Sequence, residues 1–250
     1  MNLKACWLFV ALSSIGTQAL ATDPSVVEKV VQEAIHLTPD IDNGRRLYQV
    51  CAVCHTPEGW GTQNGYYPQL AGQLPSVIIK QLADIQLRNR DNPTMYPFAM
   101  PSSFGGAQEM ADVAAYVSVM PMDPDNGVGP GFELRRGEWL YRELCADCHG
   151  ARGEGQPEDH IPLIQGQHYE YLVRQFRWIA MGKRRNVDPE MVKQIRSYRS
   201  PDISAIMDYV SRLRPPAEKL AQRGYTNPDF PNFSRRALPR SIYRSRSRRH

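Results

Sequence analysis

Apolar residues recur every three or four positions along much of this chain. The spacing is clear over residues 78–85, 169–180 and 203–213, and it is typical of amphipathic helices. No segment shows the sustained alternation of apolar and polar residues that is typical of half-buried strands. A further amphipathic helix is expected over residues 22–38. The pattern therefore predicts an all-α protein.

Proline and glycine divide this helical pattern into units. Residues 121–131 hold three prolines and three glycines, so this stretch cannot continue a helix and is interpreted as a linker. It separates a first domain over residues 39–120 from a second domain over residues 132–214. Residues 215–250 are rich in arginine and proline with little apolar periodicity, and we expect them to form a flexible tail.

Residues 1–21 have the features of a signal peptide. Lys4 precedes a short apolar run over residues 5–15, and Ala19 to Ala21 form a small-x-small cleavage site. Cleavage near Ala21 would release the mature protein into the periplasm. An uncleaved anchor is the alternative, but the apolar run is short for a membrane span.

Two copies of a Cys-x-x-Cys-His motif begin 94 residues apart, at residues 51 and 145. Two thiols at this spacing can add to the two vinyl groups of one haem, and the adjacent histidine can then ligate the iron. A zinc site would use pairs that lie closer together, and a thioredoxin-like dithiol does not explain the histidines. The sequence therefore predicts two haem c groups, attached through Cys51, Cys54, Cys145 and Cys148, with His55 and His149 as iron ligands.

The motifs belong to two copies of one longer repeat, which indicates a duplicated domain. A Gly-Gln pair follows each histidine at the same distance, at residues 72–73 and 166–167. A glycine and a tyrosine precede each motif, and another tyrosine lies near the end of each copy. We expect the first and last helices of each domain to cross closely at Gly44 and Gly137, with Tyr48 packing near Tyr116 and Tyr141 near Tyr209.

An electron-transfer haem needs a sixth ligand, and methionine sulfur raises the potential by stabilising ferrous iron. Each copy contains an (Asn or Asp)-Pro-x-Met sequence, which ends 40 residues after His55 at Met95 and 42 residues after His149 at Met191. These two methionines are the predicted ligands. Met100 lies in the same proline-rich loop as Met95 and is an alternative, whereas Met191 is the only methionine in its predicted loop.

Charge is distributed unevenly along the chain. Residues 234–250 contain seven arginines and no acidic residue, although the formal net charge of the whole chain is only +4. Residues 22–233 are therefore acidic, with 22 basic and 26 acidic side chains. This pattern suggests docking of the tail on an anionic membrane surface or an acidic partner, with a solvated extension of no function as the alternative. Because export is expected, no nucleic acid partner is predicted.

Together these features resemble the cytochrome c4 family of dihaem cytochromes. The resemblance rests on the two haem motifs, the Pro-x-Leu-Ala-Gly-Gln stretch at 68–73, its equivalent at 163–167, and the Arg-Asn region before the ligand methionine. It implies two class I cytochrome c folds that face each other, each wrapped around one covalently attached haem. Thr56 departs from the family, which usually has glycine after the first histidine.

The resemblance implies an electron carrier rather than an enzyme. Such a carrier would pass single electrons between redox proteins, such as a dehydrogenase and a terminal oxidase. The alternative is a cytochrome subunit of an oxidoreductase, or a dihaem enzyme similar to thiosulfate dehydrogenases or peroxidases. An enzyme of that kind would need an open or unusually ligated haem, and the mature chain has no spare cysteine to act as an iron ligand.

Overall fold

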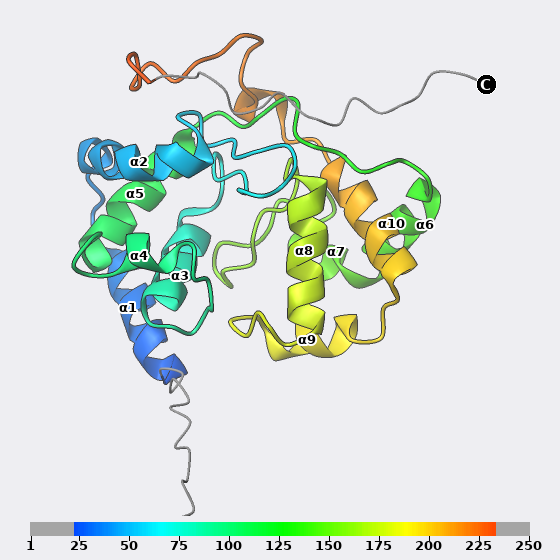
Figure 1. The fold of residues 1–250 in the computed structure, drawn as a ribbon. Helices are drawn as coiled ribbons and strands as arrows, with labels where there is room; N and C mark the ends of the chain where they lie inside the picture. The colour runs from blue at the N-terminus through cyan, green and yellow to red at the C-terminus, as the bar shows by residue number, and fades with distance from the viewer. Residues whose placement is uncertain (1–22, 234–250) are drawn as a thin grey trace, which may run out of the picture.

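The helices gather in two lobes that are joined by long loops (Figure 1). The computed structural model describes residues 23–233, so the predicted signal peptide and the arginine-rich residues 234–250 lie outside the described residues. Between residues 23 and 233 the chain forms no strand, which confirms the all-α prediction. None of the helices in this part of the chain is long and apolar enough to cross a bilayer.

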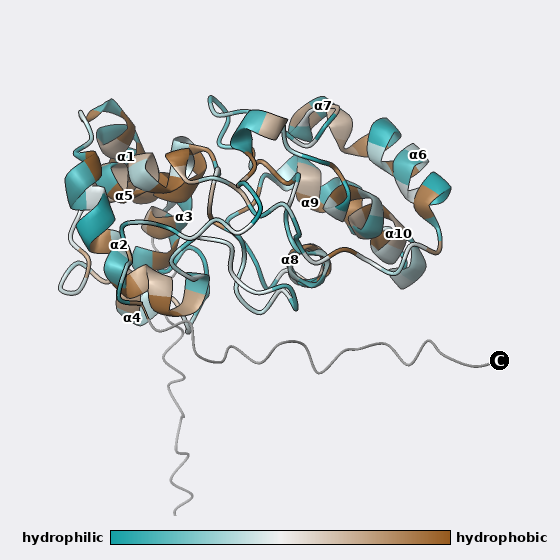
Figure 2. Ribbon diagram, turned by 90° about the horizontal axis from the view of Figure 1, so that it is seen from above, coloured by the Kyte–Doolittle hydropathy of each residue, from teal (hydrophilic) through white to brown (hydrophobic). Residues whose placement is uncertain are grey.

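The two lobes lie side by side in both views (Figures 1 and 2). The first lobe contains α1 (Pro24–His36), α2 (Ile41–His55), α3 (Pro75–Gln86), α4 (Tyr96–Ala99) and α5 (Ala107–Val119). The second lobe contains α6 (Leu134–Leu144), α7 (Ala146–His149), α8 (Tyr169–Ala180), α9 (Pro189–Ile195) and α10 (Ser200–Ser211). The loops that follow the two histidines contact each other, since the Gln69 N–H donates to the Gln167 side chain at 3.0 Å.

In each lobe the first helix of the repeat crosses the last helix at a glycine. A Cβ atom on Gly44 in α2 would lie 2.1 Å from the Asp112 carbonyl oxygen in α5. One on Gly137 in α6 would lie 2.0 Å from the Ala205 carbonyl oxygen in α10. No side chain fits at these distances, so the predicted close crossings are confirmed in both lobes.

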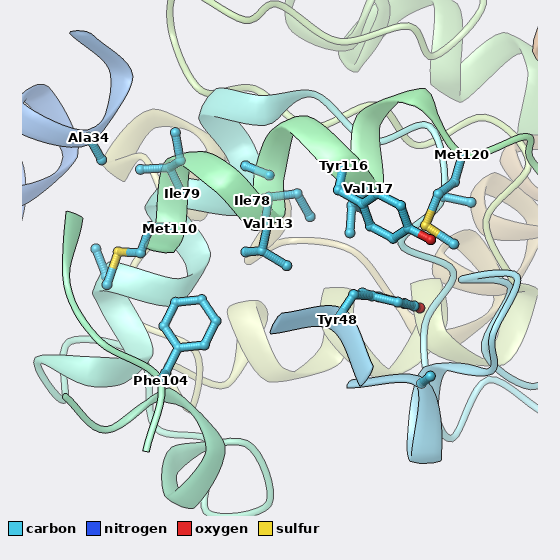
Figure 3. Packing of buried hydrophobic residues seen from close by; sticks show 14 of the residues in the cluster. Ala34, Tyr48, Ile78, Ile79, Phe104, Met110, Val113, Tyr116, Val117 and Met120 are labelled. Carbon is cyan, nitrogen blue, oxygen red and sulfur yellow. The ribbon is translucent and has the colours of Figure 1, made fainter. Parts of the chain in front are cut away.

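A pair of tyrosines packs beside each crossing. In the first lobe Tyr48 and Tyr116 lie next to each other (Figure 3), with their ring centroids 5.6 Å apart. Those of Tyr141 and Tyr209 also lie 5.6 Å apart, which confirms the pairing expected from the repeat. The same buried cluster also contains the side chains of Ile78, Ile79, Phe104, Met110, Val113 and Val117 (Figure 3).

The helix α1 covers one side of the first lobe. Its side chains Val27, Val31 and Ala34 are buried against α3 and α5. Asp23 starts the helix, because its carboxylate accepts a hydrogen bond from the Ser25 N–H at 2.9 Å. The helix expected over residues 22–38 is therefore present and extends the core of this lobe.

After the second lobe the chain returns to the first (Figure 1), so the prediction of a flexible tail from residue 215 is wrong for residues 215–233. Phe230 is 4% exposed, and its ring meets the Tyr48 ring edge-on with centroids 6.0 Å apart. The buried Asn227 side chain donates to the Pro57 carbonyl oxygen at 2.7 Å. The prediction failed because these contacts join residues far apart in the chain, and no local periodicity marks them.

The linker packs between the lobes. Met122 is buried beside two equivalent glycines: a Cβ on Gly72 would lie 2.5 Å from its Cγ, and one on Gly166 would lie 3.2 Å from its Cε. The Met122 N–H donates to the Lys219 carbonyl oxygen at 2.7 Å. The linker therefore helps to fix the two lobes in place as well as connecting them.

Replacing Gly44 with alanine should destabilise the first lobe. In an unobstructed helix alanine is favoured over glycine by about 1 kcal/mol, so the substitution would stabilise the protein if the helices did not cross closely here. We expect Gly44→Ala to lower the free energy of unfolding by about 1–3 kcal/mol, because the methyl group would overlap α5. Denaturant unfolding measures the change.

Arg46→Ala is the matched control, because Arg46 lies on the same helix and is exposed. It should change the free energy of unfolding by no more than about 0.5 kcal/mol. A Gly44→Ala protein as stable as the wild type, or more stable, would contradict the crossing.

Candidate haem-binding sites

The first motif ends the helix α2, with His55 as its last residue. The imidazole of His55 is 4% exposed, and its Nδ1 lies 3.0 Å from the Pro68 carbonyl oxygen. A carbonyl oxygen can only accept a hydrogen bond, so Nδ1 must carry the proton and Nε2 has a free lone pair. Burial lowers the pKa of His55, more than the bond to Pro68 raises it, which keeps the ring neutral. A neutral ring with a free lone pair can bind iron.

The second motif lies on a broken helix. Cys145 separates α6 from α7, with φ −121° and ψ −30°. The sequence explains the break: Cys145 follows Tyr141 by four residues, whereas Cys51 follows Tyr48 by three. The extra residue would rotate the second motif around the helix axis, and the break compensates for it.

Despite the break, the His149 ring is held like the His55 ring. Its Nδ1 lies 3.1 Å from the Pro162 carbonyl oxygen, and burial lowers the pKa of His149. In both lobes the accepting proline follows its histidine by 13 residues. The two imidazoles are therefore equivalent, each neutral and each with one nitrogen bonded to the backbone.

A glycine closes the loop after each histidine. The Gly61 N–H donates to the His55 carbonyl oxygen at 2.9 Å, and the Gly155 N–H donates to the His149 carbonyl oxygen at 2.8 Å. These glycines have φ of 68° and 73°, and a Cβ on either would lie within 2.5 Å of a backbone oxygen. Such tight turns return the chain toward the imidazole, where the proline carbonyl can accept from it.

The four cysteines of the motifs, Cys51, Cys54, Cys145 and Cys148, form no disulfide. Burial raises the pKa of Cys51 to about 11 and that of Cys145 to about 12, so these thiols stay protonated at neutral pH. Residues 23–233 also contain no group of three or more His, Cys, Asp or Glu side chains that could share a metal ion. Free thiols beside a neutral imidazole fit a covalently attached haem.

The comparisons with known proteins agree with this geometry. The family model of cytochrome c matches residues 41–120 and 134–214. A cytochrome c4 from Thiocapsa roseopersicina is 35% identical over 175 residues, which cover 66% of this chain and 87% of that protein. The chain belongs to the cytochrome c4 family. It therefore has two cytochrome c domains and two covalently bound haem c groups, as predicted.

A solved structure shows the same architecture. Reduced recombinant cytochrome c4 from Pseudomonas stutzeri matches with a TM-score of 0.64 and 26% identity, over 71% of this chain and 100% of that chain. A thiosulfate dehydrogenase electron acceptor from Thiomonas intermedia is 34% identical over 143 residues, which cover 54% of this chain and 64% of that protein. Membership of the cytochrome c4 family makes this protein a dihaem electron-transfer cytochrome.

The methionines predicted as ligands lie on or beside short helices. Met95 precedes α4 and Met100 follows it, and both are half-buried. Met191 lies in the first turn of α9 rather than in a loop, because Asp188 caps this helix by accepting from two backbone N–H groups. Met191 packs against the same apolar cluster as Cys145. The loop prediction for Met191 is therefore wrong, although this methionine and its haem motif share one cluster.

A polar network between the lobes was not predicted. The Gln81 Oε1 accepts from Arg90 of its own lobe at 2.7 Å and from Arg184 of the other lobe at 3.1 Å. Reciprocally, the Gln175 Oε1 accepts from Arg184 at 3.0 Å and from Arg90 at 3.2 Å. Burial, and then the charge of Arg90, lower the pKa of Arg184 to about 9. The two glutamines recur at the same place in the repeat, 94 residues apart, and so do the two arginines, but the sequence does not show that the four side chains meet.

His168 connects the second lobe to the linker and to the first lobe. Its buried ring accepts at Nδ1 from the Gly127 N–H at 3.0 Å, and its Nε2 lies 2.6 Å from the Trp60 carbonyl oxygen. Both contacts need the neutral tautomer with the proton on Nε2. Burial accordingly lowers the pKa of His168. Leu74 stands at the equivalent position of the first copy, so only one side of the interface has this contact.

Acid should weaken the interface through His168. Its pKa is lower in the folded than in the unfolded chain, so its contribution to stability is complete above the ordinary histidine pKa of about 6.5 and falls as the pH drops below that value. Glutamine does not titrate in this range. We therefore expect the stability of His168→Gln to fall less than that of the wild type between about pH 6.5 and about pH 5. Thermal unfolding of both proteins across this pH range measures the difference.

His36→Gln is the control, because His36 is exposed and its ring contacts the Gln32 carbonyl oxygen of its own helix. Its stability should follow the wild-type pH profile. Parallel profiles for wild type and His168→Gln would show that another group causes the decline.

Proposed function

We propose that this protein is a periplasmic carrier that passes single electrons between respiratory-chain proteins. The proposed iron ligands are His55 with Met95 and His149 with Met191, and the proposed attachment points are Cys51, Cys54, Cys145 and Cys148. The observation that carries this proposal is the pair of neutral imidazoles, buried at His55 and half-buried at His149, each bonded through Nδ1 to a proline carbonyl. Two filled axial positions limit the rearrangement between ferric and ferrous iron, which suits a carrier.

We assign one haem to each half of the chain, with residues 39–120 and 132–214 as the two domains and 121–131 as the linker. The matches of the cytochrome c family to residues 41–120 and 134–214 support these bounds. Residues 1–21 are proposed as the export signal, which places the carrier in the periplasm.

Bound haem supplies a redox-active iron and two propionate carboxylates. The interface between the lobes suits those carboxylates, because Arg90 and Arg184 lie there around the same two glutamine oxygens. The buried carboxylate that joins this network, Asp84, already binds Lys80 at 2.8 Å. The cluster therefore carries excess positive charge in a partly buried place, where an uncompensated charge is costly. We assign Arg90 and Arg184 to the propionates.

Methionine variants of the holoprotein test the ligation. The oxidised wild type should show the sulfur-to-iron charge-transfer band of methionine ligation at both haems, and the reduced protein should resist carbon monoxide. Met191→Ala should lose about half of the band and bind carbon monoxide at one haem, because it opens one axial position. Met95→Ala should do the same at the other haem.

Met100→Ala is the matched control in the first domain. It should keep the full band if Met95 is the ligand. Loss of the band in Met100→Ala with retention in Met95→Ala would reassign the ligand to Met100. A wild-type protein without haem, or with a vacant axial position, would refute the proposed carrier function.

The arginine-rich residues 234–250 are proposed to dock the carrier on an anionic membrane surface. The described chain ends beside the first lobe, where the rings of Phe233 and Phe230 lie 6.3 Å apart, so this segment begins there. The segment contains seven arginines and no acidic residue. Each basic side chain near an anionic surface contributes about 1 kcal/mol of binding, and salt screens the attraction.

Deletion of residues 234–250 should therefore abolish binding to vesicles that contain anionic lipid, as measured by co-sedimentation at low salt. Vesicles of purely zwitterionic lipid are the control and should bind neither protein. The deletion should leave the redox titration unchanged. Equal binding of both chains would contradict the membrane role, and salt-sensitive binding only to an acidic redox protein would favour the alternative partner.

A second candidate function is that of an electron acceptor within a thiosulfate-oxidising system. The similarity to a thiosulfate dehydrogenase electron acceptor favours it. The oxidised holoprotein should then be reduced by thiosulfate only when a thiosulfate dehydrogenase is added. Rapid reduction by thiosulfate alone would instead make this protein the enzyme.

A further inference from the structure

Two glutamines at equivalent positions of the repeat bind the backbone of the opposite lobe. The Gln73 Oε1 accepts from the Leu163 N–H at 3.0 Å, and its Nε2 donates to the Leu163 carbonyl oxygen at 2.8 Å. The Gln167 Oε1 accepts from the Gln69 N–H at 3.0 Å, and its Nε2 donates to the Gln69 carbonyl oxygen at 2.9 Å. We call each of these two-bond contacts a glutamine clamp.

Each clamp acts on the peptide group that holds the histidine of the other lobe. The Gln69 N–H and the Pro68 carbonyl belong to one peptide group, and this carbonyl accepts from His55 Nδ1. The same relation joins the Leu163 N–H to the carbonyl that accepts from His149. A hydrogen bond at the N–H of a peptide group polarises the whole group and makes its oxygen a stronger acceptor.

We propose that Gln73 and Gln167 are positioning residues that tune the iron site of the opposite domain. A stronger acceptor at Nδ1 makes the histidine more basic, and a more basic ligand favours ferric iron. Gln73 therefore lowers the reduction potential of the haem in the second domain, and Gln167 lowers that of the haem in the first. This inference rests on the proposed ligation by His55 and His149.

The clamped groups are buried, and hydrogen bonds are stronger where water is excluded. Gln69, Leu163 and Gln167 are 3%, 4% and 7% exposed, so water competes little for these groups. The Gln69 side chain is itself fixed, because it accepts from the Asp123 N–H at 2.7 Å and donates to the Gly166 carbonyl at 2.8 Å. Contact between the lobes is therefore coupled to the basicity of both histidines.

A crossed effect of the two substitutions is the expected result. Gln73→Leu should raise the potential of the second-domain haem by up to about 59 mV, a tenfold change in its reduction equilibrium, and leave the first-domain haem nearly unchanged. Gln167→Leu should do the converse. Spectroelectrochemical titration of the holoprotein, with each haem followed through its own NMR signals, measures both potentials.

A second readout separates tuning from a looser interface. In Gln73→Leu the Nδ1 proton of His149 should shift upfield, because its hydrogen bond weakens, while that of His55 should stay in place. Gln73→Glu keeps an acceptor for the Leu163 N–H, although it loses the donor to the Leu163 carbonyl. It should therefore return the Nδ1 proton of His149 toward its wild-type chemical shift. Ser76→Ala is the matched control, because it removes a 2.7 Å hydrogen bond between the lobes, to the Pro157 carbonyl, that touches neither clamped peptide.

Three results would overturn the proposal: no change in potential, equal changes at both haems, or a change at the haem of the substituted domain itself. If the methionine band is intact in the same samples, the proposed carrier function still stands. Loss of that band or of haem from the wild type would instead refute the proposed function.

Discussion

The structure depends on a hydrogen bond that is made twice, from an imidazole to a proline carbonyl 13 residues further along the chain. Because a carbonyl cannot donate, this bond fixes the tautomer of each ring, and burial keeps each ring neutral. The surrounding features hold the bond in place. A tyrosine hydroxyl donates to the residue after each histidine, at 2.9 Å in the first lobe and 2.6 Å in the second, and a glycine turn then leads the chain back to the ring.

Duplication explains why both sides of the interface use the same residue types. In an isologous contact, a residue on one side meets a second residue on the other, and the same pair meets again in reverse. Gln73 and Gln167 follow this rule, as do the arginine and glutamine pairs of the polar network. One glutamine in an ancestral domain could therefore form both clamps. Met122 and His168 break the symmetry, because the single linker and the His168 contacts exist on one side only.

Local features of the sequence predicted most of the fold and the covalent part of the sites. The haem motifs, the apolar spacing and the repeated glycine and tyrosine positions sufficed for the all-α prediction and for the helix crossings. The packing of residues 215–233 escaped prediction because it depends on contacts between distant segments, such as Asn227 with Pro57. The clamps were not predicted for the same reason, because the pairing of Gln69 with Gln167 depends on how the lobes face each other. The sequence showed only that Gln73 recurs at Gln167.

Because the two clamps are alike, they do not distinguish the two haem sites, and the differences between the sites lie in other residues. Thr56 has a φ of 66° directly after the first histidine, where the second lobe has Gly150 with a φ of 83°. With ψ at 156°, Thr56 lies in a region that is nearly restricted to glycine and costs about 1–3 kcal/mol for another residue. The Trp60 N–H donates to the Thr56 hydroxyl at 3.2 Å and helps to hold it there. The second lobe differs at another place, because its helix breaks at Cys145. The two sites therefore differ in their surroundings even though their histidines are bonded alike.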